Sequence, residues 1–252
     1  MTNIILRGCN GKMGNVITQM VEEDENAVIV AGIDVSKASM EDKYPVYYSF
    51  VQCNVPADVI IDFSAPVNVR EMIDFAIRRG IGIVLCTTGF SKEDQVLIEE
   101  ASRIIPILRS ANMSMGINLI LKMVKEAARV LTDSGFDIEI VEKHHNKKVD
   151  APSGTALAIA NSINEALNNQ YEYVYDRTDI RAPRVKNEIG ISSLRGGTIV
   201  GEHEIVFAGN DEVIEIKHTA YSKAIFAKGA IQAAKYLSGK PAGMYDMNEV
   251  IG

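Results

Sequence analysis

The chain has 252 residues and a formal net charge of −7 at pH 7, with 47% hydrophobic and 23% charged residues. These values are ordinary for a globular protein, and the length suits one large domain or two modest ones. We expect no nucleic-acid partner, because phosphate binding needs clustered Lys and Arg in excess. We also expect no membrane association, because no apolar run approaches the roughly 20 residues of a membrane helix.

The three cysteines, Cys9, Cys53 and Cys86, are widely scattered and show neither disulfide nor metal-ligand spacing. We interpret them as small buried residues of a protein in a reducing compartment. Residues 1–7 hold a short apolar run without a small-residue cleavage site, which indicates a first strand and not a signal peptide. The sequence therefore predicts a cytoplasmic protein.

Up to residue 108, short apolar segments alternate with helical segments. Strands are predicted at 3–8, 28–34, 59–63, 81–86 and 104–108. Helices are predicted at 13–23, 67–79 and 91–102. Such alternation is typical of βαβ units with a parallel sheet, and strands that are apolar throughout indicate helices on both faces.

The pattern changes after residue 115. Helices are predicted at 116–131 and 155–167, and strands at 136–140, 189–194, 199–208 and 213–219. The glycine-containing turns between the later strands favour a largely antiparallel or mixed sheet, and the polar stretch 168–184 is predicted as a loop. A last helix at 224–237 is expected to pack on the first domain. We therefore predict one domain from 1–115 with 223–252, and a second from 116–222.

A glycine-rich loop follows the first strand, with Gly8, Gly11 and Gly14 spaced Gly-x-x-Gly-x-x-Gly. A dinucleotide pyrophosphate would lie here on a helix N-terminus, and glycines let the backbone approach the phosphates. Asp34 ends the second strand, where an acidic side chain would accept hydrogen bonds from the adenosine ribose. The pattern predicts dinucleotide binding, and a plain glycine turn in an α/β fold is the alternative.

Two further segments, 86–89 and 110–113, come directly after predicted strands. Ligands of open α/β sheets lie at the carboxyl ends of the strands, so both segments would reach the edge where the dinucleotide is expected. Thr87 and Thr88 are equally compatible with ordinary strand-end or cap residues.

The segment 142–156 carries the most informative chemistry. Two imidazoles and two ammonium groups stand at the end of a predicted strand: His144, His145, Lys147 and Lys148. A helix start with Ser153, Gly154 and Thr155 follows, and its amides and dipole would attract an anion. Histidine and lysine can exchange protons with a carboxylate-bearing substrate in such a pocket.

A simpler interpretation is also open for this segment. The histidines and lysines can be solvated surface residues, and 150–153 can be a turn that leads into a helix. No metal site is expected, because His144 and His145 would point to opposite faces of a strand and no carboxylate or thiol stands at a convincing spacing.

The run 144–156 reads His-His-Asn-Lys-Lys-Val-Asp-Ala-Pro-Ser-Gly-Thr-Ala. It resembles the signature of the 4-hydroxy-tetrahydrodipicolinate reductase family, also called dihydrodipicolinate reductases. Other segments are similar to blocks of that family: the loop 8–14, the turn 62–64, and the segments 87–90, 193–197, 200–203 and 237–240. The resemblance covers nearly the whole chain.

The resemblance implies an oxidoreductase of diaminopimelate and lysine biosynthesis. The family reduces a small cyclic dicarboxylate, the product of dihydrodipicolinate synthase, to tetrahydrodipicolinate, with loss of water and a hydride from NADH or NADPH. It also implies an α/β fold in which a Rossmann-type dinucleotide-binding domain joins a smaller α+β domain. The open mixed sheet of that smaller domain is expected to build a homotetramer.

By motif position, the resemblance makes His144 the catalytic acid/base and Lys148 the proton donor. The residues expected to bind the substrate carboxylate are His145, Ser153, Gly154 and Thr155. The residues expected to contact the cofactor are Gly8, Cys9, Asn10, Gly11, Lys12, Met13, Asp34, Cys86, Thr87, Thr88, Ser110, Ala111, Asn112 and Met113.

NADH is the expected preference of the two cofactors, because Asp34 would repel a 2′-phosphate. Family members that use NADPH well usually carry arginines where this chain has Val35 and Ala65. Lys12 and Lys37 could offer a point charge to the phosphate, but without the bidentate geometry of arginine.

The strands at 199–208 and 213–219 have apolar residues at both odd and even positions, such as Ile205 with Val206 and Val213 with Ile214. We therefore expect a two-sided apolar sheet, with one face left for another subunit.

Two other functions compete with this interpretation. A semialdehyde dehydrogenase of the acylating type needs a nucleophilic cysteine, and the three cysteines here lie in poor places for one. A dinucleotide-sensing module would need the glycine loop but would have no use for His144 and Lys148.

Overall fold

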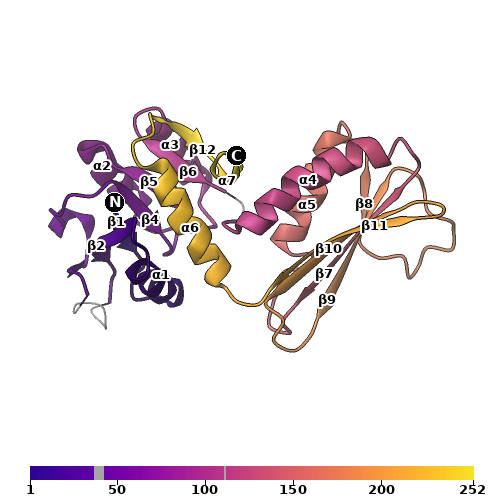
Figure 1. Ribbon diagram of the computed structural model, residues 1–252, viewed down its shortest axis with the longest axis horizontal. Coiled ribbons are helices and arrows are strands. Elements are labelled where there is room, and N and C mark those ends of the chain that lie inside the picture. Colours follow the sequence, from indigo (N-terminus) through magenta and orange to yellow (C-terminus); the bar gives the residue numbers. More distant parts are fainter. Residues whose placement is uncertain (37–42, 111) are drawn as a thin grey trace. The chain divides into compact units, whose positions relative to one another are not determined.

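The computed structural model describes residues 1–36, 43–110 and 112–252. The chain divides into two compact units, one of residues 1–114 with 224–252 and one of residues 115–223 (Figure 1). No described helix has the length and apolar character that crossing a membrane requires.

The first unit is built on a parallel sheet of seven strands in the order β12-β6-β5-β4-β1-β2-β3. The strands are β1 (Thr2–Arg7), β2 (Ala27–Ile33), β3 (Val46–Tyr47), β4 (Val59–Asp62), β5 (Gly82–Leu85), β6 (Pro106–Arg109) and β12 (Gly243–Tyr245). The five strands predicted before residue 109 and their parallel pairing are confirmed. The short edge strands β3 and β12 were not predicted.

Helices cover both faces of this sheet. They are α1 (Lys12–Glu22), α2 (Val69–Arg79), α3 (Lys92–Ser102), α6 (Ala224–Leu237), α7 (Met247–Ile251) and the 3-10 turn η1 (Phe50–Gln52). Successive strand residues enter opposite apolar clusters, as Ile60 packs with α2 and α3 while Ile61 packs with α1 and α6. Strands buried on both sides are therefore apolar along most of their length, although β4 ends in the buried Asp62.

The second unit has a mixed sheet, as predicted, and its strand order is β11-β10-β7-β9-β8. Its strands are β7 (Asp137–His144), β8 (Glu172–Val174), β9 (Glu188–Arg195), β10 (Gly201–Ala208) and β11 (Val213–Ala220). Strand β10 runs antiparallel to β7 and β11, whereas β7 and β8 run parallel to β9. Strand β8 lies inside the stretch 168–184 that was predicted to be only a loop.

Two helices, α4 (Met115–Leu131) and α5 (Gly154–Ala166), supply the apolar cover of one sheet face. Strand β7 shows the resulting alternation, because its even-numbered residues are buried and its odd-numbered residues are half-buried. His144 and Glu142 therefore stand on the covered face, in the same row as Ile138 and Ile140.

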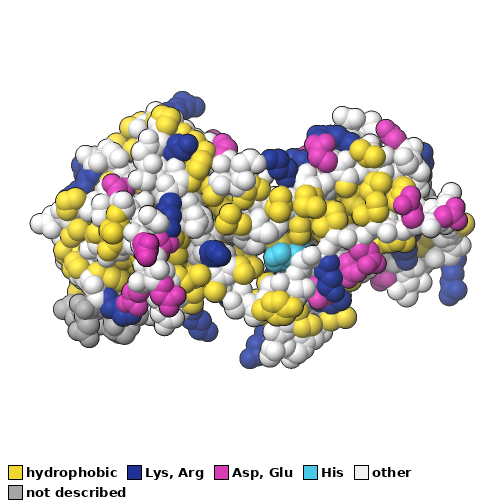
Figure 2. Space-filling model, in the orientation of Figure 1, with side chains coloured by type: hydrophobic (Ala, Val, Ile, Leu, Met, Phe, Trp, Pro, Cys, Tyr) yellow, Lys and Arg dark blue, Asp and Glu magenta, His cyan; other side chains and the backbone are white. Residues whose placement is uncertain are grey.

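The opposite face of this sheet is not apolar, and the expectation of a two-sided apolar sheet is wrong. Ile205 is buried, but Val206 shares the outer face with Glu202 and Glu204. Lys217 of β11 lies 3.0 Å from Glu202 and extends the row of charges. Figure 2 shows one side of the molecule, where basic and acidic side chains lie close to one another at several places beside hydrophobic ones.

Candidate active site

The glycine loop between β1 and α1 has the close backbone packing that only glycine permits. Gly8 adopts φ +80°, and a Cβ there would lie 2.5 Å from the carbonyl oxygen of Phe63. Gly11 is the N-cap of α1 and has no side chain to cap the first-turn amides. A loop and helix start of this kind fit the pyrophosphate of a dinucleotide.

Asp34 stands beside this loop and fixes it to the end of β2. One carboxylate oxygen accepts the backbone N–H of Asn10 at 3.0 Å, and the other accepts the N–H and hydroxyl of Ser36, each at 3.0 Å. A pocket next to Asp34 is lined by Arg7, Val35 and Ala65 among others. The structure thus brings the predicted loop and the predicted acidic residue together.

The segment after β5 joins the same edge of the sheet. The buried Thr87 hydroxyl accepts the N–H of Ser64 at 3.1 Å, which ties the turn after β4 to the end of β5. Cys86 is half-buried and Thr88 is exposed.

After β6, the segment that follows includes Ser110, Asn112 and Met113. The carbonyl oxygen of Asn112 accepts a hydrogen bond from the Ser110 hydroxyl at 3.1 Å, and Met113 is buried in the apolar core. Ala111, also expected to contact the cofactor, lies outside the described residues.

None of the cysteines is suited to act as a nucleophile. Burial raises the pKa of the Cys9 thiol to about 11 and raises the pKa of Cys86 well above its ordinary value. Burial also raises the pKa of Cys53. A thiol must ionise to attack a carbonyl, so the structure disfavours acylating dehydrogenase chemistry.

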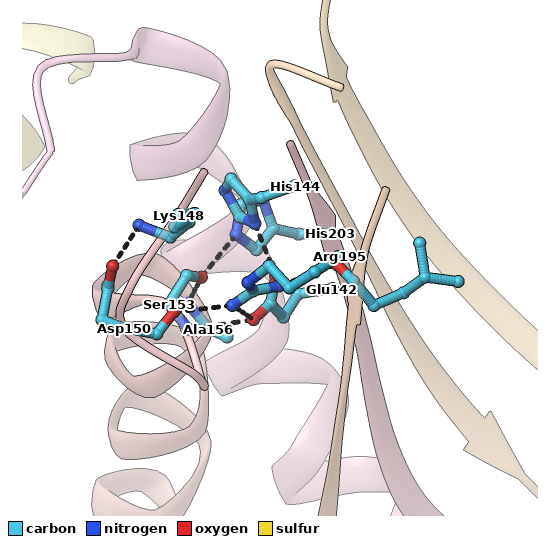
Figure 3. A network of polar contacts seen from close by, with 9 residues as sticks. Glu142, His144, Lys148, Asp150, Ser153, Ala156, Arg195 and His203 are labelled. Carbon is cyan, nitrogen blue, oxygen red and sulfur yellow. Dashed lines mark hydrogen bonds and ion pairs between the residues drawn. The ribbon is translucent and has the colours of Figure 1, made fainter. Parts of the chain in front are cut away.

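In the second unit, the carboxylate of Glu142 organises a buried polar network at the end of β7 (Figure 3). One oxygen accepts Arg195 Nη2 at 2.6 Å and the backbone N–H of Ser153 at 3.0 Å. The other accepts Arg195 Nη1 at 2.8 Å and contacts His144 Nδ1 at 2.5 Å. A single carboxylate thereby connects β7, β9 and the start of α5.

Lys148 and the N-terminus of α5 lie beside this network. The Lys148 ammonium forms an ion pair with Asp150 at 2.8 Å, and the Asp150 carbonyl accepts Arg195 Nη2 at 2.7 Å. The Ser153 hydroxyl caps α5 by accepting the Ala156 N–H at 3.1 Å. The region expected from the sequence to carry the chemistry is thus one continuous arrangement in space.

The residues expected to bind substrate differ in how they are held. Ser153 is buried, and its hydroxyl lies 3.1 Å from His203 Nε2, so it is already engaged within the protein. Gly154 is exposed and Thr155 is half-buried in the first turn of α5. His145 is half-buried, and its Nδ1 has no partner within the part of the chain that the structure describes.

Burial and hydrogen bonds set the charge states of the network. Burial alone would raise the pKa of Glu142, but hydrogen bonds from Arg195, His144 and Ser153 outweigh it and lower the pKa to about 2. Burial lowers the pKa of His144, although Glu142 opposes the effect. Burial and the nearby His144 lower the pKa of His203 to about 4. At neutral pH the network therefore holds an ionised Glu142 and a neutral His203.

Sequence reasoning assigned no role to Glu142, Arg195 or His203. The sequence could have indicated Glu142, because residues two positions apart in a strand point to the same face and Glu142 stands two residues before His144. The place of Arg195 and His203 in the site follows only from strand pairing. The register sets Arg195 opposite His144 and His203 opposite Glu142. Among residues 1–36, 43–110 and 112–252, no group of three or more His, Cys, Asp or Glu is arranged to hold a metal ion.

Comparison with known families covers both units. Residues 2–113 match the family model for the N-terminus of dihydrodipicolinate reductase, and residues 116–251 match the model for its C-terminus.

Individual proteins show the same similarity. The chain is 49% identical over 251 residues to a 4-hydroxy-tetrahydrodipicolinate reductase of Caldanaerobacter subterraneus, which covers 100% of this chain and 98% of the relative. It is 36% identical to the enzyme of that name from Alkaliphilus metalliredigens, over 99% and 98% of the two chains. A dipicolinate-bound dihydrodipicolinate reductase from Paenisporosarcina has the same fold, with a TM-score of 0.81, 24% identity and coverage of 98% and 97%. The chain belongs to the dihydrodipicolinate reductase family.

Proposed function

We propose that the chain reduces 4-hydroxy-tetrahydrodipicolinate to tetrahydrodipicolinate with NADH or NADPH, in diaminopimelate and lysine biosynthesis. The observation that carries this proposal is the arrangement at the end of β7, where His144 is oriented by a buried carboxylate and Lys148 lies beside the anion-attracting start of α5. The test is a fall in NADH absorbance when freshly made dihydrodipicolinate synthase product is supplied. A purified chain that leaves both NADH and NADPH unoxidised would contradict the proposal.

We propose specific roles for the residues of the second unit. Gly154 and Thr155, in the first turn of α5, hold a substrate carboxylate through the amides and dipole of the helix, with Ser153 fixing that turn and His145 beside it. Lys148 donates the proton that the reduced ring must gain, and its ion pair with Asp150 keeps the ammonium in place.

In the same scheme, His144 acts as the acid/base at the substrate. Its Nδ1 is hydrogen-bonded to Glu142, so Nε2 is the ring nitrogen that can exchange a proton with the substrate.

The nucleotide is proposed to bind in the first unit and, when bound, supplies the hydride. The glycine loop Gly8 to Met13 would hold the pyrophosphate, and Asp34 would face the adenosine ribose. The segment 86–88 and residues Ser110, Asn112 and Met113 would complete the site at the carboxyl ends of β5 and β6. The close packing around Gly8 supports this assignment, since any side chain there would displace the loop.

We expect NADH to be preferred over NADPH by roughly tenfold or less, since one charge contact near a surface is worth about 1 kcal/mol. Val35 and Ala65 offer no guanidinium to a 2′-phosphate, and Arg7, which also lines the pocket, is held by Asp62 at 3.4 Å. Lys37 lies outside the described residues. The measurement is kcat/KM for each cofactor at low salt.

A matched pair of substitutions tests the cause of this preference. Val35→Arg should raise kcat/KM with NADPH, whereas the uncharged Val35→Gln should leave the ratio of the two cofactors near that of the unmodified chain. A clear NADPH preference in the unmodified chain would contradict the prediction and would require Asp34 to turn away from the ribose.

We propose a homotetramer assembled through the sheet of the second unit. The outer face carries ion pairs, so apolar burial alone does not demand a partner. Exposed apolar side chains nevertheless occur on this sheet, namely Leu194, Val213 and Ile214. We expect light scattering at micromolar concentration to give about four times the mass of one chain, and a monomeric mass would count against the assembly.

We also propose the cytoplasm as the location. The three cysteines are free thiols, as expected of a protein from a reducing compartment.

A further inference from the structure

The carboxylate of Glu142 is one of the most completely bonded groups in the second unit. Its side chain has no exposed surface, and its two oxygens accept bonds from Arg195, from the Ser153 amide and from the His144 ring. Arg195 binds both oxygens, a bidentate geometry that holds a carboxylate ionised and fixed in orientation. Such a group is too costly to bury unless its partners compensate for the lost water.

This arrangement determines which nitrogen of His144 carries the proton. An ionised carboxylate only accepts hydrogen bonds, so the ring nitrogen beside it, Nδ1, must be the donor. In neutral imidazole the other nitrogen, Nε2, then has a lone pair and can accept a proton. Gly201 lies close to this nitrogen, and its lack of a side chain avoids a contact, because a Cβ on it would lie 3.1 Å from Nε2.

The same carboxylate also positions the second candidate group. Arg195, held by Glu142, donates to the carbonyl of Asp150, and the Asp150 carboxylate binds Lys148. Glu142 further bonds the amide of Ser153, directly before the first turn of α5. One buried side chain thus links the acid/base, the proton donor and the anion-attracting turn.

We propose that Glu142, supported by Arg195, is a positioning residue that fixes His144 in the form protonated at Nδ1 and presents Nε2 to the substrate. The inference rests on the proposed function, because it explains how His144 performs the role assigned there. In this proposal Glu142 makes no contact with the substrate and acts through the groups that it holds in place, above all through His144.

Several charged or titratable groups face His144 from the elements packed around it. Glu142 lies on the same strand, Lys148 on the following loop, Arg195 on β9 and His203 on β10. The His203 ring packs edge-on at 5.1 Å between centroids. Lys148 and Arg195 disfavour a positive charge on His144, and of these groups Glu142 alone favours it. Loss of the Glu142 charge should therefore make His144 harder to protonate.

The test compares Glu142→Gln with Glu139→Gln as a matched control. Glu139 lies on the same strand but on the outer face, where it pairs with Arg184. We expect Glu142→Gln to lower kcat on the order of tenfold to a hundredfold, a part of the ~10²–10⁴-fold that a whole acid/base group supplies. The limb of the kcat–pH profile controlled by His144 should move to lower pH, because the carboxylate that favours its protonated form is lost. KM for NADH should not change, and Glu139→Gln should match the unmodified chain.

Each outcome of this comparison is decisive. If Glu142→Gln keeps kcat within about twofold, or loses kcat without moving the pH limb, the positioning role is wrong and the carboxylate only supports the fold. An unmodified chain with no reductase activity would instead defeat the proposed function. The ¹⁵N chemical shifts of the His144 ring in the unmodified protein still decide the inference in that case, and also if Glu142→Gln fails to fold. Neutral His144 protonated at Nδ1 supports it, and protonation at Nε2 overturns it.

Discussion

We expect His144→Ala and Lys148→Ala each to lower kcat on the order of 10²–10⁴-fold, the usual contribution of a positioned general acid or base. Hydride addition to an electron-poor ring leaves negative charge on its carbon and nitrogen frame, and a proton must follow. His144 is oriented by Glu142 and Lys148 by Asp150, so either truncation removes a preorganised group. Affinity for NADH should change little, because neither residue belongs to the unit with the glycine loop.

The measurement is kcat with saturating cofactor, together with the dissociation constant of NADH from fluorescence titration. Lys147→Ala is the matched control, because Lys147 is the exposed neighbour of Lys148 and carries the same charge. The control should retain the activity of the unmodified chain. Near-normal turnover in both His144→Ala and Lys148→Ala would show that the assigned mechanism is wrong.

The fold could be predicted to a large extent because burial leaves a clear pattern in the sequence. Strand segments covered on both faces, such as 59–61, are continuously apolar, and β7 alternates because only one of its faces is covered. The edge strands β3 and β12, of two and three residues, are too short to produce a pattern. The outer face of the second sheet was mispredicted because apolar residues such as Val206 stand among glutamates, and only strand pairing shows which residues share a face.

In the second unit, the candidate site could be predicted only where its residues are close in sequence. His144, Lys148 and Ser153 lie within one segment, and the resemblance to a family assigned them together. Glu142 and Arg195 are 53 positions apart and meet because β9 pairs in parallel with β7. Partnerships of this kind depend on tertiary structure, so the group that orients His144 emerged from the fold and not from the motif.

The second large effect is expected from Gly14→Ala in the first turn of α1. A Cβ at Gly14 would lie 2.3 Å from the carbonyl oxygens of both Gly8 and Cys9, which are backbone atoms that cannot move aside without shifting the loop. Helix propensity alone would make the substitution stabilising by about 1 kcal/mol, since alanine is the better helix former. We expect the steric cost to prevail and to destabilise the protein by about 3 kcal/mol, at the upper end of typical overpacking. The melting temperature should then fall by roughly 6–12 °C.

Gly11→Ala, in the same loop, is the control variant. It shows whether the loop tolerates alanine in general or whether the effect comes from the close packing at Gly14. A Cβ at Gly11 meets only the Gly8 carbonyl oxygen, at 3.2 Å, so we expect a melting temperature within a few degrees of the unmodified chain. NADH affinity, measured by titration on both variants, should fall in Gly14→Ala because the displaced Gly8 and Cys9 carbonyls are part of the proposed phosphate loop. A Gly14→Ala protein as stable as the unmodified chain would mean that propensity outweighs the contact. The close approach of α1 to the loop would then not be what requires glycine at this position.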